Sequence, residues 1–527
     1  MNNEAVMLEA ESRRITPYAT GLLVAVSILA LLDGVNGALG STLRPYLMGS
    51  FSATPDQITS VAVGYFAVKL FALLMAARVQ ERFGQRRALL GAAILLVAAT
   101  AGSLWVTSYP ALLVVQSLQG AGGGLVLALG QGDLLMAFGR RHQPLVQAIF
   151  ALATVMFPAT IVPLLLGGYA YGSDWRLAYG WMVLLGSASC FWLFWQRKFL
   201  KSSTTHHTIP VVRIVLLLIM LFCVAYLLQQ GNRHGWLESP FIVWPALLAV
   251  TCLATLGFAE SDGRPPCLRY RCFQFSDFSF GICVSLLAGI ALLSSGFVIP
   301  SFMGGVLAAP ALQSGQVQFF AVGYTTLSLL TVGIVLRFTK CPPFIFLALG
   351  LLLFGTAMWN LGKVPANTDI SGIVSWLAMR GLALGGLFLP LTLLTLTGVP
   401  PKDAVAASGW FNFGRQFGGL VGIAWMQTLQ THLVARNQTV LGETLTAASP
   451  NFSTYVEAAR NTVAWQGAPL GKIPALANAL TLQEAQRQMN SVALNGCFQT
   501  IAMFFVFSLP LAIIARILTV RLLKHPS

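Results

Sequence analysis

The chain has 527 residues, of which 56% are hydrophobic and only 9% are charged. Soluble domains carry about 25% charged residues, so this composition excludes an ordinary globular protein. The formal charge of +15 does not indicate nucleic-acid binding. Nucleic-acid binders gather their basic residues on one polar face, whereas here the basic residues separate long apolar segments.

Long apolar segments recur along the whole chain, with short polar connections between them. A helix crosses the core of a bilayer with about 20 mostly apolar residues, and the pattern predicts fourteen such helices. We expect them near residues 17–39, 58–77, 88–106, 110–135, 145–169, 178–196, 209–229, 239–259, 278–301, 317–336, 343–361, 372–398, 404–429 and 497–519. The predicted fold class is an all-α integral membrane protein.

Lysine and arginine near the span ends set the orientation, because cytoplasmic loops carry an excess of both. If both termini are cytoplasmic, twenty of these residues fall in inside segments and only four, Arg44, Arg176, Arg233 and Lys363, fall in short outside loops. We therefore expect both ends inside, including residues 1–16, and a multi-pass protein of the inner (plasma) membrane.

A faint internal repeat indicates how the spans are grouped. Residues 116–124, in the fourth span, contain a glycine-rich run that residues 380–386, in the twelfth, echo. Duplicated bundles are the usual build of secondary transporters. We predict an N-terminal six-helix bundle over residues 17–201, two linking spans over 202–260 and a C-terminal six-helix bundle over 261–527.

The C-terminal bundle contains a long external loop at about residues 430–496. The loop is polar and capable of forming a helix at residues 475–490. It is either a docking surface for a partner or a solvated cap, and the cap is the favoured interpretation.

No pattern of catalysis, metal binding or nucleotide binding is present in the sequence. The eight cysteines lie in predicted spans or inside loops, so no disulfide framework is expected. The six histidines show no metal-ligand spacing, and there is no phosphate-binding loop or nucleophile elbow. We expect neither an enzyme, nor a metal, nor a cofactor.

One loop carries a recognisable motif. Residues 77–87 read Ala-Arg-Val-Gln-Glu-Arg-Phe-Gly-Gln-Arg-Arg, between the second and third spans. This run resembles the signature of the major facilitator superfamily, Gly-x-x-x-Asp-Arg-x-Gly-Arg-Arg/Lys-Arg/Lys, with Glu81 at the acidic position. The segments 174–176 and 408–419 also resemble the fourteen-span drug:proton antiporter branch of that family.

The resemblance implies a major-facilitator-type fold of two six-helix bundles plus two central spans. It implies proton-coupled export of amphipathic small molecules by alternating access, with the proton gradient as energy source. In double-membrane bacteria it also implies a periplasmic adaptor and an outer-membrane channel as partners.

Two positions depart from the family pattern. Gln116 stands where the fourth span usually has an arginine linked to proton coupling. The span-five motif, usually Gly-Pro-x-x-Gly-Gly, is altered around Pro163, Gly167 and Gly168. Both departures bear on the coupling route and, to a lesser degree, on the direction of transport.

The motif loop has two interpretations. Its arginines could serve only to keep the loop inside, or the loop could latch the two bundles together on the cytoplasmic side. The latch is favoured, because Glu81 and Gly84 contribute nothing to topology. The predicted gating residues are Glu81, Arg82, Gly84, Arg86 and Arg87.

Ionisable groups inside spans are costly and mark function by default. Asp33, in the first span, is the predicted proton carrier, and the alternative is a fixed ion pair with Lys69. Lys69, in the second span, is a second titrating group or a counter-charge for an anionic substrate.

Arg380 and Arg415 stay charged, so they hold a carboxylate-bearing ligand or clamp helices together. With Lys69 they make three embedded basic groups against one acid, which favours neutral or anionic amphiphiles as substrates. The predicted substrate-binding residues are Gln116, Gln119, Arg380, Arg415, Trp410 and Phe411.

Small residues at spacings of four allow helices to approach closely. The predicted helix-packing residues are Gly120, Gly124, Pro163, Gly167, Gly168, Gly414 and Gly418.

The function favoured by the sequence is secondary active transport, with the bilayer, protons and a small molecule as partners and no nucleic acid. The alternative is a dedicated exporter or importer of one metabolite, such as a siderophore or an organic or fatty acid. A receptor or scaffold would need a sizeable soluble domain, which the sequence does not show.

Overall fold

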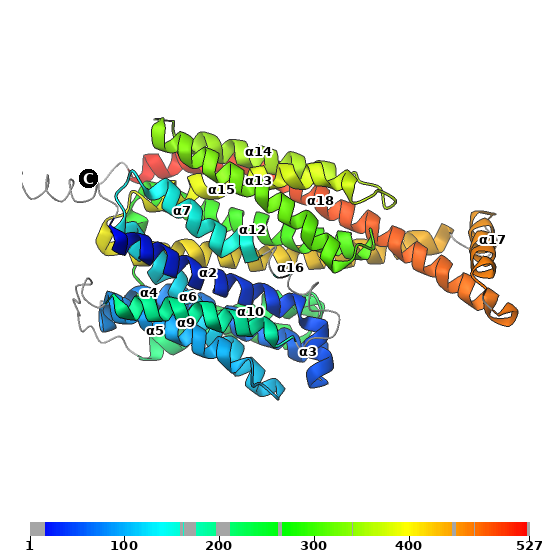
Figure 1. The fold of residues 1–527 in the computed structure, drawn as a ribbon, viewed down its shortest axis with the longest axis horizontal. Coiled ribbons are helices and arrows are strands. Elements are labelled where there is room, and N and C mark those ends of the chain that lie inside the picture. The colour runs from blue at the N-terminus through cyan, green and yellow to red at the C-terminus, as the bar shows by residue number, and fades with distance from the viewer. Residues whose placement is uncertain are drawn as a thin grey trace, which may run out of the picture.

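The computed structural model describes residues 16–158, 162, 175–196, 211–261, 266–339, 341–444, 450–467 and 469–523. Every regular element in these residues is a helix. The long helices run roughly parallel or antiparallel to one another (Figure 1). In chain order the main helices are α2 (Pro17–Thr42), α3 (Arg44–Phe51), α4 (Pro55–Phe83), α5 (Gln85–Gly102), α6 (Tyr109–Ala137), α7 (Gln143–Ala151), α9 (Leu177–Trp195), α10 (Val211–Gln230), α11 (Pro240–Ser261), α12 (Ser276–Gly305), α13 (Ala311–Phe338), α14 (Pro343–Leu361), α15 (Ser371–Leu396), α16 (Ala404–Thr444), α17 (Pro450–Trp465) and α18 (Ile473–Leu523).

Eleven of the described helices are long and apolar enough to cross a membrane. The predicted spans near 88–106, 145–169 and 404–429 are also largely helical where described. They correspond to α5, which ends at Gly102, to α7 with the π-helical segment η1 (Leu152–Met156), and to α16. The all-α membrane class is confirmed, while the count of fourteen spans stays a prediction.

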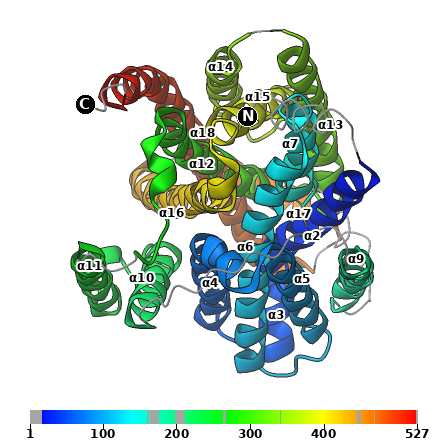
Figure 2. The same ribbon diagram turned by 90° about the vertical axis from the view of Figure 1, so that its left-hand side faces the viewer.

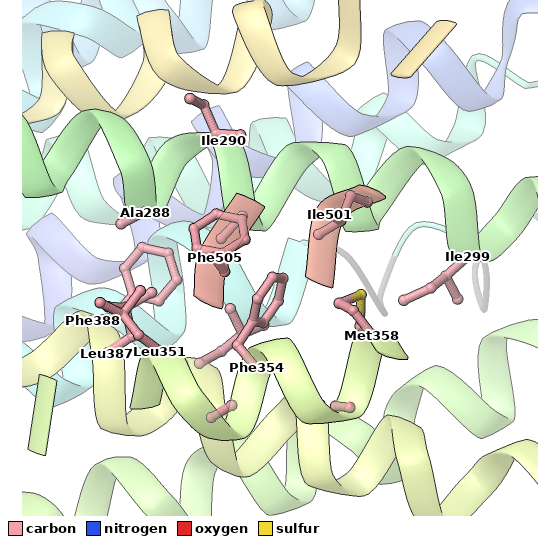
Figure 3. Packing of buried hydrophobic residues seen from close by; sticks show 14 of the residues in the cluster. Ala288, Ile290, Ile299, Leu351, Phe354, Met358, Leu387, Phe388, Ile501 and Phe505 are labelled. Carbon is pink, nitrogen blue, oxygen red and sulfur yellow. The ribbon is translucent and has the colours of Figure 1, made fainter. Parts of the chain in front are cut away.

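Two hydrophobic cores divide the molecule. One joins α2, α4, α5, α6 and α9, and the other joins α12 to α16 with α18. In the second core, Phe354 of α14 and Phe505 of α18 meet edge to face, with ring centroids 5.0 Å apart, while α12 and α15 contribute neighbouring side chains (Figure 3). Within a bilayer such side chains stabilise the helix contacts by van der Waals packing rather than by removal from water, and each half has its own set of these contacts.

Helix α7 connects the halves. It follows α6 in the chain, but Ala148 and the next segment's Leu152 are buried in the second core. Figure 2 shows α7 beside α13 and α15.

The linking helices α10 and α11 lie at the edge of the molecule (Figure 2). Leu217 and Leu221 of α10 are buried against α4, and Leu420 of α16 joins the same cluster. Helix α11 packs mainly on α10, and only 22% of the residues in its most apolar stretch are buried. This side of α10 therefore contacts both halves, and α11 offers an apolar surface that suits lipid.

Helices α16 and α18 extend far beyond a bilayer. With 41 and 51 residues and a rise of 1.5 Å per residue, they are about 62 Å and 77 Å long, against a hydrocarbon core of about 30 Å. They project together from one end of the bundle, where α17 joins them (Figure 1). The segment at about 430–496, predicted as an external loop, is thus helical over most of its described length.

The start of α2 and the end of α18 both lie at the opposite end of the bundle (Figure 1). We call this end the inner end, because the arginine distribution predicts that it is cytoplasmic. We call the end that carries α17 the outer end.

Candidate functional site

A buried ion pair lies in the N-terminal half, between α2 and α4. The Lys69 ammonium lies 2.8 Å from Asp33 Oδ2, and both side chains are at most 4% exposed. Tyr65, one turn away on α4, donates its hydroxyl to Asp33 Oδ1 at 3.0 Å and accepts from Lys69 Nζ at 3.1 Å. The two predicted proton-coupling residues are therefore in direct contact, with a tyrosine as third member.

Glycines of α6 make room for this pair. A Cβ at position 123 would lie 1.8 Å from Asp33 Oδ1, and at position 120 it would lie 2.2 Å from the carbonyl oxygen of Tyr65. At position 124 it would lie 2.6 Å from the carbonyl of Lys69. The absence of side chains on this face lets α6 close directly over the ion pair.

A chain of amide side chains connects the halves. Arg415 of α16 donates to Asn412 Oδ1 at 2.6 Å, and Asn412 donates to Gln131 Oε1 of α6 at 2.6 Å. Gln131 in turn donates to Gln147 of α7 at 2.9 Å. All four side chains are buried. The sequence interpretation missed Asn412, Gln131 and Gln147, although uncharged amides in the middle of apolar spans are themselves a signal, because a buried polar group needs a partner.

Arg380 of α15 lies in the C-terminal half. Its Nε and Nη2 both donate to Ser295 Oγ of α12, at 3.1 and 2.9 Å. Among the described residues no carboxylate forms a salt bridge with Arg380 or with Arg415. Both guanidinium groups in the membrane region therefore have hydrogen bonds but no salt bridge to a described residue, and Asp33 interacts with Arg415 at longer range.

The other four predicted substrate-binding residues are spread over three parts of the molecule. Gln116 donates to Tyr179 at 3.3 Å and Gln119 donates to Ser103 at 2.8 Å, both inside the N-terminal half. Phe411 is fully buried in the C-terminal core. Gln116 and Gln119 lie apart from the two arginines, whereas the Arg415 guanidinium lies over the Phe411 ring, 5.9 Å from its centroid. The role of all three in binding stays a prediction.

Trp410, the fourth, lies near the inner end. Its indole donates to the carbonyl of Arg269 at 3.0 Å, and its ring packs edge to face on Phe273 with centroids 5.2 Å apart. This places Trp410 beside the motif loop.

The motif loop takes part in a network of charges that joins the halves at the inner end. Glu81 of α4 pairs with Arg78 at 2.9 Å and with Arg269, from the segment between α11 and α12. Arg269 also lies 3.6 Å from Asp403, just before α16. Arg78 donates to the carbonyls of Pro266 and Cys267. We call Arg78, Glu81, Arg269 and Asp403 the inner latch.

The other predicted gating residues lie beside this latch. Gly84 ends α4 and begins α5 with φ 79° and ψ 152°, a backbone conformation essentially limited to glycine. Arg86 donates to the carbonyl of Phe194 on α9. Arg82 and Arg87 are exposed. The sequence did not predict Arg269 as a gating residue, because this partner of the motif loop lies nearly two hundred residues away along the chain.

The helices themselves also meet at the inner end. A Cβ at Gly409 would lie 2.4 Å from the carbonyl of Leu73, and one at Gly132 would lie 2.5 Å from Val405 Cγ2. These contacts join α4 and α6 to α16. At the outer end, by contrast, a cavity of about 540 Å³ is lined by residues of α3, α4, α10, α12 and α16.

Of the predicted helix-packing residues, Gly120, Gly124 and Gly418 lie at close helix crossings, the last with a virtual Cβ 2.1 Å from the carbonyl of Leu286. Gly414 has more space, with its nearest neighbour at 3.6 Å. Pro163, Gly167 and Gly168 lie outside the described residues.

These two helical halves, with a buried ion pair inside the first, one end packed shut and the other hollow, define a membrane transporter of the alternating-access type. The family model of the Major Facilitator Superfamily matches residues 25–423. The chain belongs to this superfamily, and the resemblance inferred from its motifs is confirmed.

Relatives and solved structures agree with this assignment. A multidrug export protein, EmrB, of Haemophilus influenzae is 25% identical over 84% of this chain and 88% of its own length. The fatty acid resistance protein FarB of Neisseria gonorrhoeae is 22% identical over 94% of this chain and 95% of its own length. The crystal structure of the human organic anion transporter MFSD10 has a TM-score of 0.56 at 12% identity, covering 93% of this chain and all of that one, which shows a shared fold.

Proposed function

We propose that this protein exports neutral or anionic amphiphilic small molecules in exchange for protons. The observation that carries the proposal is the buried contact between Asp33 and Lys69. A carboxylate buried with a counter-ion has two states, ionised and paired or protonated and unpaired. Because the pair joins α2 to α4, a change of protonation also changes a contact between helices, which is what coupling requires.

The charge balance supports the choice of substrate. Asp33 forms a salt bridge with Lys69, whereas Arg380 and Arg415 form none with the described residues, and Asp33 acts on Arg415 only at longer range. Desolvated cations without counter-charge are costly, and an anionic solute between the halves would offset that cost. Relatives named for multidrug export and for fatty acid resistance fit amphiphilic substrates of this kind.

The test is substrate-dependent proton movement in proteoliposomes. Two probes share one skeleton: 1-anilinonaphthalene-8-sulfonate is anionic and N-phenyl-1-naphthylamine is neutral. We expect an imposed proton gradient to drive the wild type to move one or both probes opposite to protons. Asp33→Asn should abolish this gradient dependence, whereas Asp369→Asn, at an exposed position between α14 and α15, should retain it. Full gradient dependence in Asp33→Asn would refute the coupling assignment.

The same ion pair favours a second function, uptake of one organic anion together with protons. The ionised Asp33 occupies Lys69, so an anion that binds Lys69 competes with it. Protonation of Asp33 would free Lys69 and strengthen anion binding, which is the linkage expected of cotransport. Movement of the anionic probe in the same direction as protons would favour this function over exchange.

A second proposal concerns assembly. A periplasmic adaptor and an outer-membrane channel would have the projecting parts of α16, α17 and α18 as a contact surface. Co-purification of the full chain with a candidate adaptor, with and without residues 445–472, would test this partnership.

A further inference from the structure

The outer cavity is lined by the helices that carry Lys69 and Arg415, nearer their outer ends. Thr59 in its wall is ten residues from Lys69 along α4, which is about 15 Å along the helix. Gln427 in the opposite wall is twelve residues from Arg415 along α16, or about 18 Å. The cavity therefore lies between the level of these buried groups and the outer side of the molecule, and we call it the outer vestibule.

The wall of the vestibule has an unusual chemical composition. Two arginines, six side-chain amides and two threonines line it, together with Phe297, Val434 and Ala435, and no carboxylate is among these lining residues in the described part of the chain. Such a surface offers many hydrogen-bond donors, and because Asp56 behind it compensates one of the two arginines, its net charge is one positive charge. It suits an anionic head group beside an apolar body.

Both arginines are held in place. Arg44 donates to the carbonyl of Pro55 at 3.2 Å and to Thr59 Oγ1 at 2.9 Å, and burial is the main cause that lowers its pKa below the usual value. Arg233 lies 2.8 Å from Asp56 Oδ1, with 42% of its side chain exposed. The guanidinium groups are thus positioned before any solute arrives.

One buried amide of the wall has an oxygen that lacks a hydrogen-bond partner among the described residues. Gln230 is 2% exposed and donates to the carbonyl of Asp56, but its side-chain oxygen accepts no hydrogen bond from the described residues. A buried acceptor without a partner costs about 1–3 kcal/mol. A hydroxyl or N–H donor on a solute would satisfy it after a small side-chain movement.

The vestibule also depends on the linking helices. Gln229, Gln230 and the residues that follow α10 form one wall, and Asn232 and Trp236 hold this wall to α16 by donating to Thr431 and Thr428. A bundle without the linking pair would lack this wall.

We propose that the outer vestibule is a second solute-binding site, selective for amphiphiles that carry an anionic group close to an O–H or N–H donor. The proposal rests on the transport function proposed above and specifies its substrate class. The anionic group binds between Arg44 and Arg233, the donor reaches Gln230, and the apolar body lies against Phe297 and Val434.

Protection of an introduced cysteine tests the proposal in the purified full chain. Ala435→Cys lies in the wall, in a background with Cys190, Cys283 and Cys341 changed to serine, and Ala464→Cys on exposed α17 is the control. We expect 1-anilinonaphthalene-8-sulfonate to slow modification by N-ethylmaleimide at position 435 at lower concentration than N-phenyl-1-naphthylamine, and neither to protect position 464. Equal protection by both probes, or none, would overturn the proposal and leave the vestibule as a water-filled passage.

Variants of Arg233 and Gln230 test the contributions of the positive charge and of the hydrogen bond separately. Arg233→Gln should weaken protection by the anionic probe about threefold, as for a partly exposed ion pair, and leave the neutral probe unchanged, while Arg233→Lys should retain most of the difference. Gln230→Leu should weaken both probes about threefold to tenfold, because both carry an N–H, whereas Gln488→Leu on α18 should change neither. Asp33→Asn should leave protection intact, so loss of proton coupling and loss of vestibule binding are distinguishable results.

Discussion

At the scale of single residues, the chemistry of this protein depends on how few charges it buries. Asp33, Lys69 and Tyr65 share their hydrogen bonds in a space closed by Gly123. The pair is a poor source of stability by itself, since desolvation offsets much of its attraction. The pair matters because removing either partner would leave the other as a buried, unpaired charge.

This view predicts a non-additive response to mutation. Lys69→Met should lower the free energy of unfolding by about 3–5 kcal/mol, because it leaves Asp33 unpaired. The double variant Asp33→Asn with Lys69→Met should recover more than half of that loss. Unfolding in SDS, followed by tryptophan fluorescence, measures both, and simple additivity of the two single changes would contradict the pair.

The space around Asp33 gives a second prediction. A methyl group at Gly123 would lie 1.8 Å from Asp33 Oδ1, while Gly91, on α5, has nothing within 4 Å of its virtual Cβ. Gly123→Ala should therefore destabilise by about 1–3 kcal/mol through overpacking, and Gly91→Ala should be neutral or stabilising, because alanine is the better helix former. Similar unfolding curves for the two variants would count against the close packing of α6 on this site.

At the scale of elements, short connections decide where the charges of the motif loop point. Gly84 ends α4 and starts α5 within one residue. The turn leaves Glu81 on the last turn of α4, where it meets Arg269 of a different connection. The acidic residue of the motif thus acts through its place on a helix end.

The turn at Gly84 is itself testable. With φ 79° and ψ 152° it adopts a conformation that costs other residues of order 1–3 kcal/mol. Gly84→Ala should lower stability by that amount and loosen the inner latch, whereas Gly257→Ala, on α11 with open space around it, should do neither. The measurements are SDS unfolding and the cysteine labelling described next.

At the scale of the whole molecule, the inner end is shut and the outer end is hollow. Arg269 contacts Glu81 of the N-terminal half and Asp403 of the C-terminal half, so the connection after the linking helices joins the two. Outside, Asn232 and Arg233 contact α16 and α4. The linking pair therefore contributes contacts between the halves at both ends.

Cys267 reports on the inner latch. Its side chain is fully buried, and its carbonyl accepts from Arg78. Burial, followed by the nearby Glu260, raises the pKa of this thiol to about 11, whereas an exposed thiol has a pKa of about 8.5. Below about pH 8 the thiol is protonated whether the latch is closed or open. Between about pH 8.5 and about pH 11 the thiol is ionised only when the latch is open, so deprotonation favours opening.

We expect Arg269→Ala to raise the rate of maleimide labelling of Cys267 roughly tenfold at pH 7.5, the size expected for losing a charged contact of partly exposed groups. The apparent pKa of labelling should also move down from about 11. Arg141→Ala, at an exposed position between α6 and α7, is the matched control and should change neither. The assay uses a variant in which the other cysteines are serine, and labelling of Cys267 at equal rates in both variants would show that Arg269 does not hold the inner end closed.

Much of this molecule is legible in its sequence. The apolar segments predict the long helices, since a bilayer core demands a minimum length of hydrocarbon-compatible helix. The embedded charges single out Asp33, Lys69, Arg380 and Arg415, since burying an ionisable group is costly enough to be rare. These are one-dimensional signals, and they need no knowledge of which helices touch.

Only the tertiary structure decides the partners. It pairs Asp33 with Lys69, joins Arg415 to Gln131 through Asn412, and brings Arg269 to Glu81. It also places Gln116 and Phe411 in helix-packing positions and collects scattered amides into the outer vestibule. The physical reason is that every long helix here is apolar around much of its surface, so periodicity does not say which face meets another helix and which meets lipid, and that choice is made by packing between segments far apart in the chain.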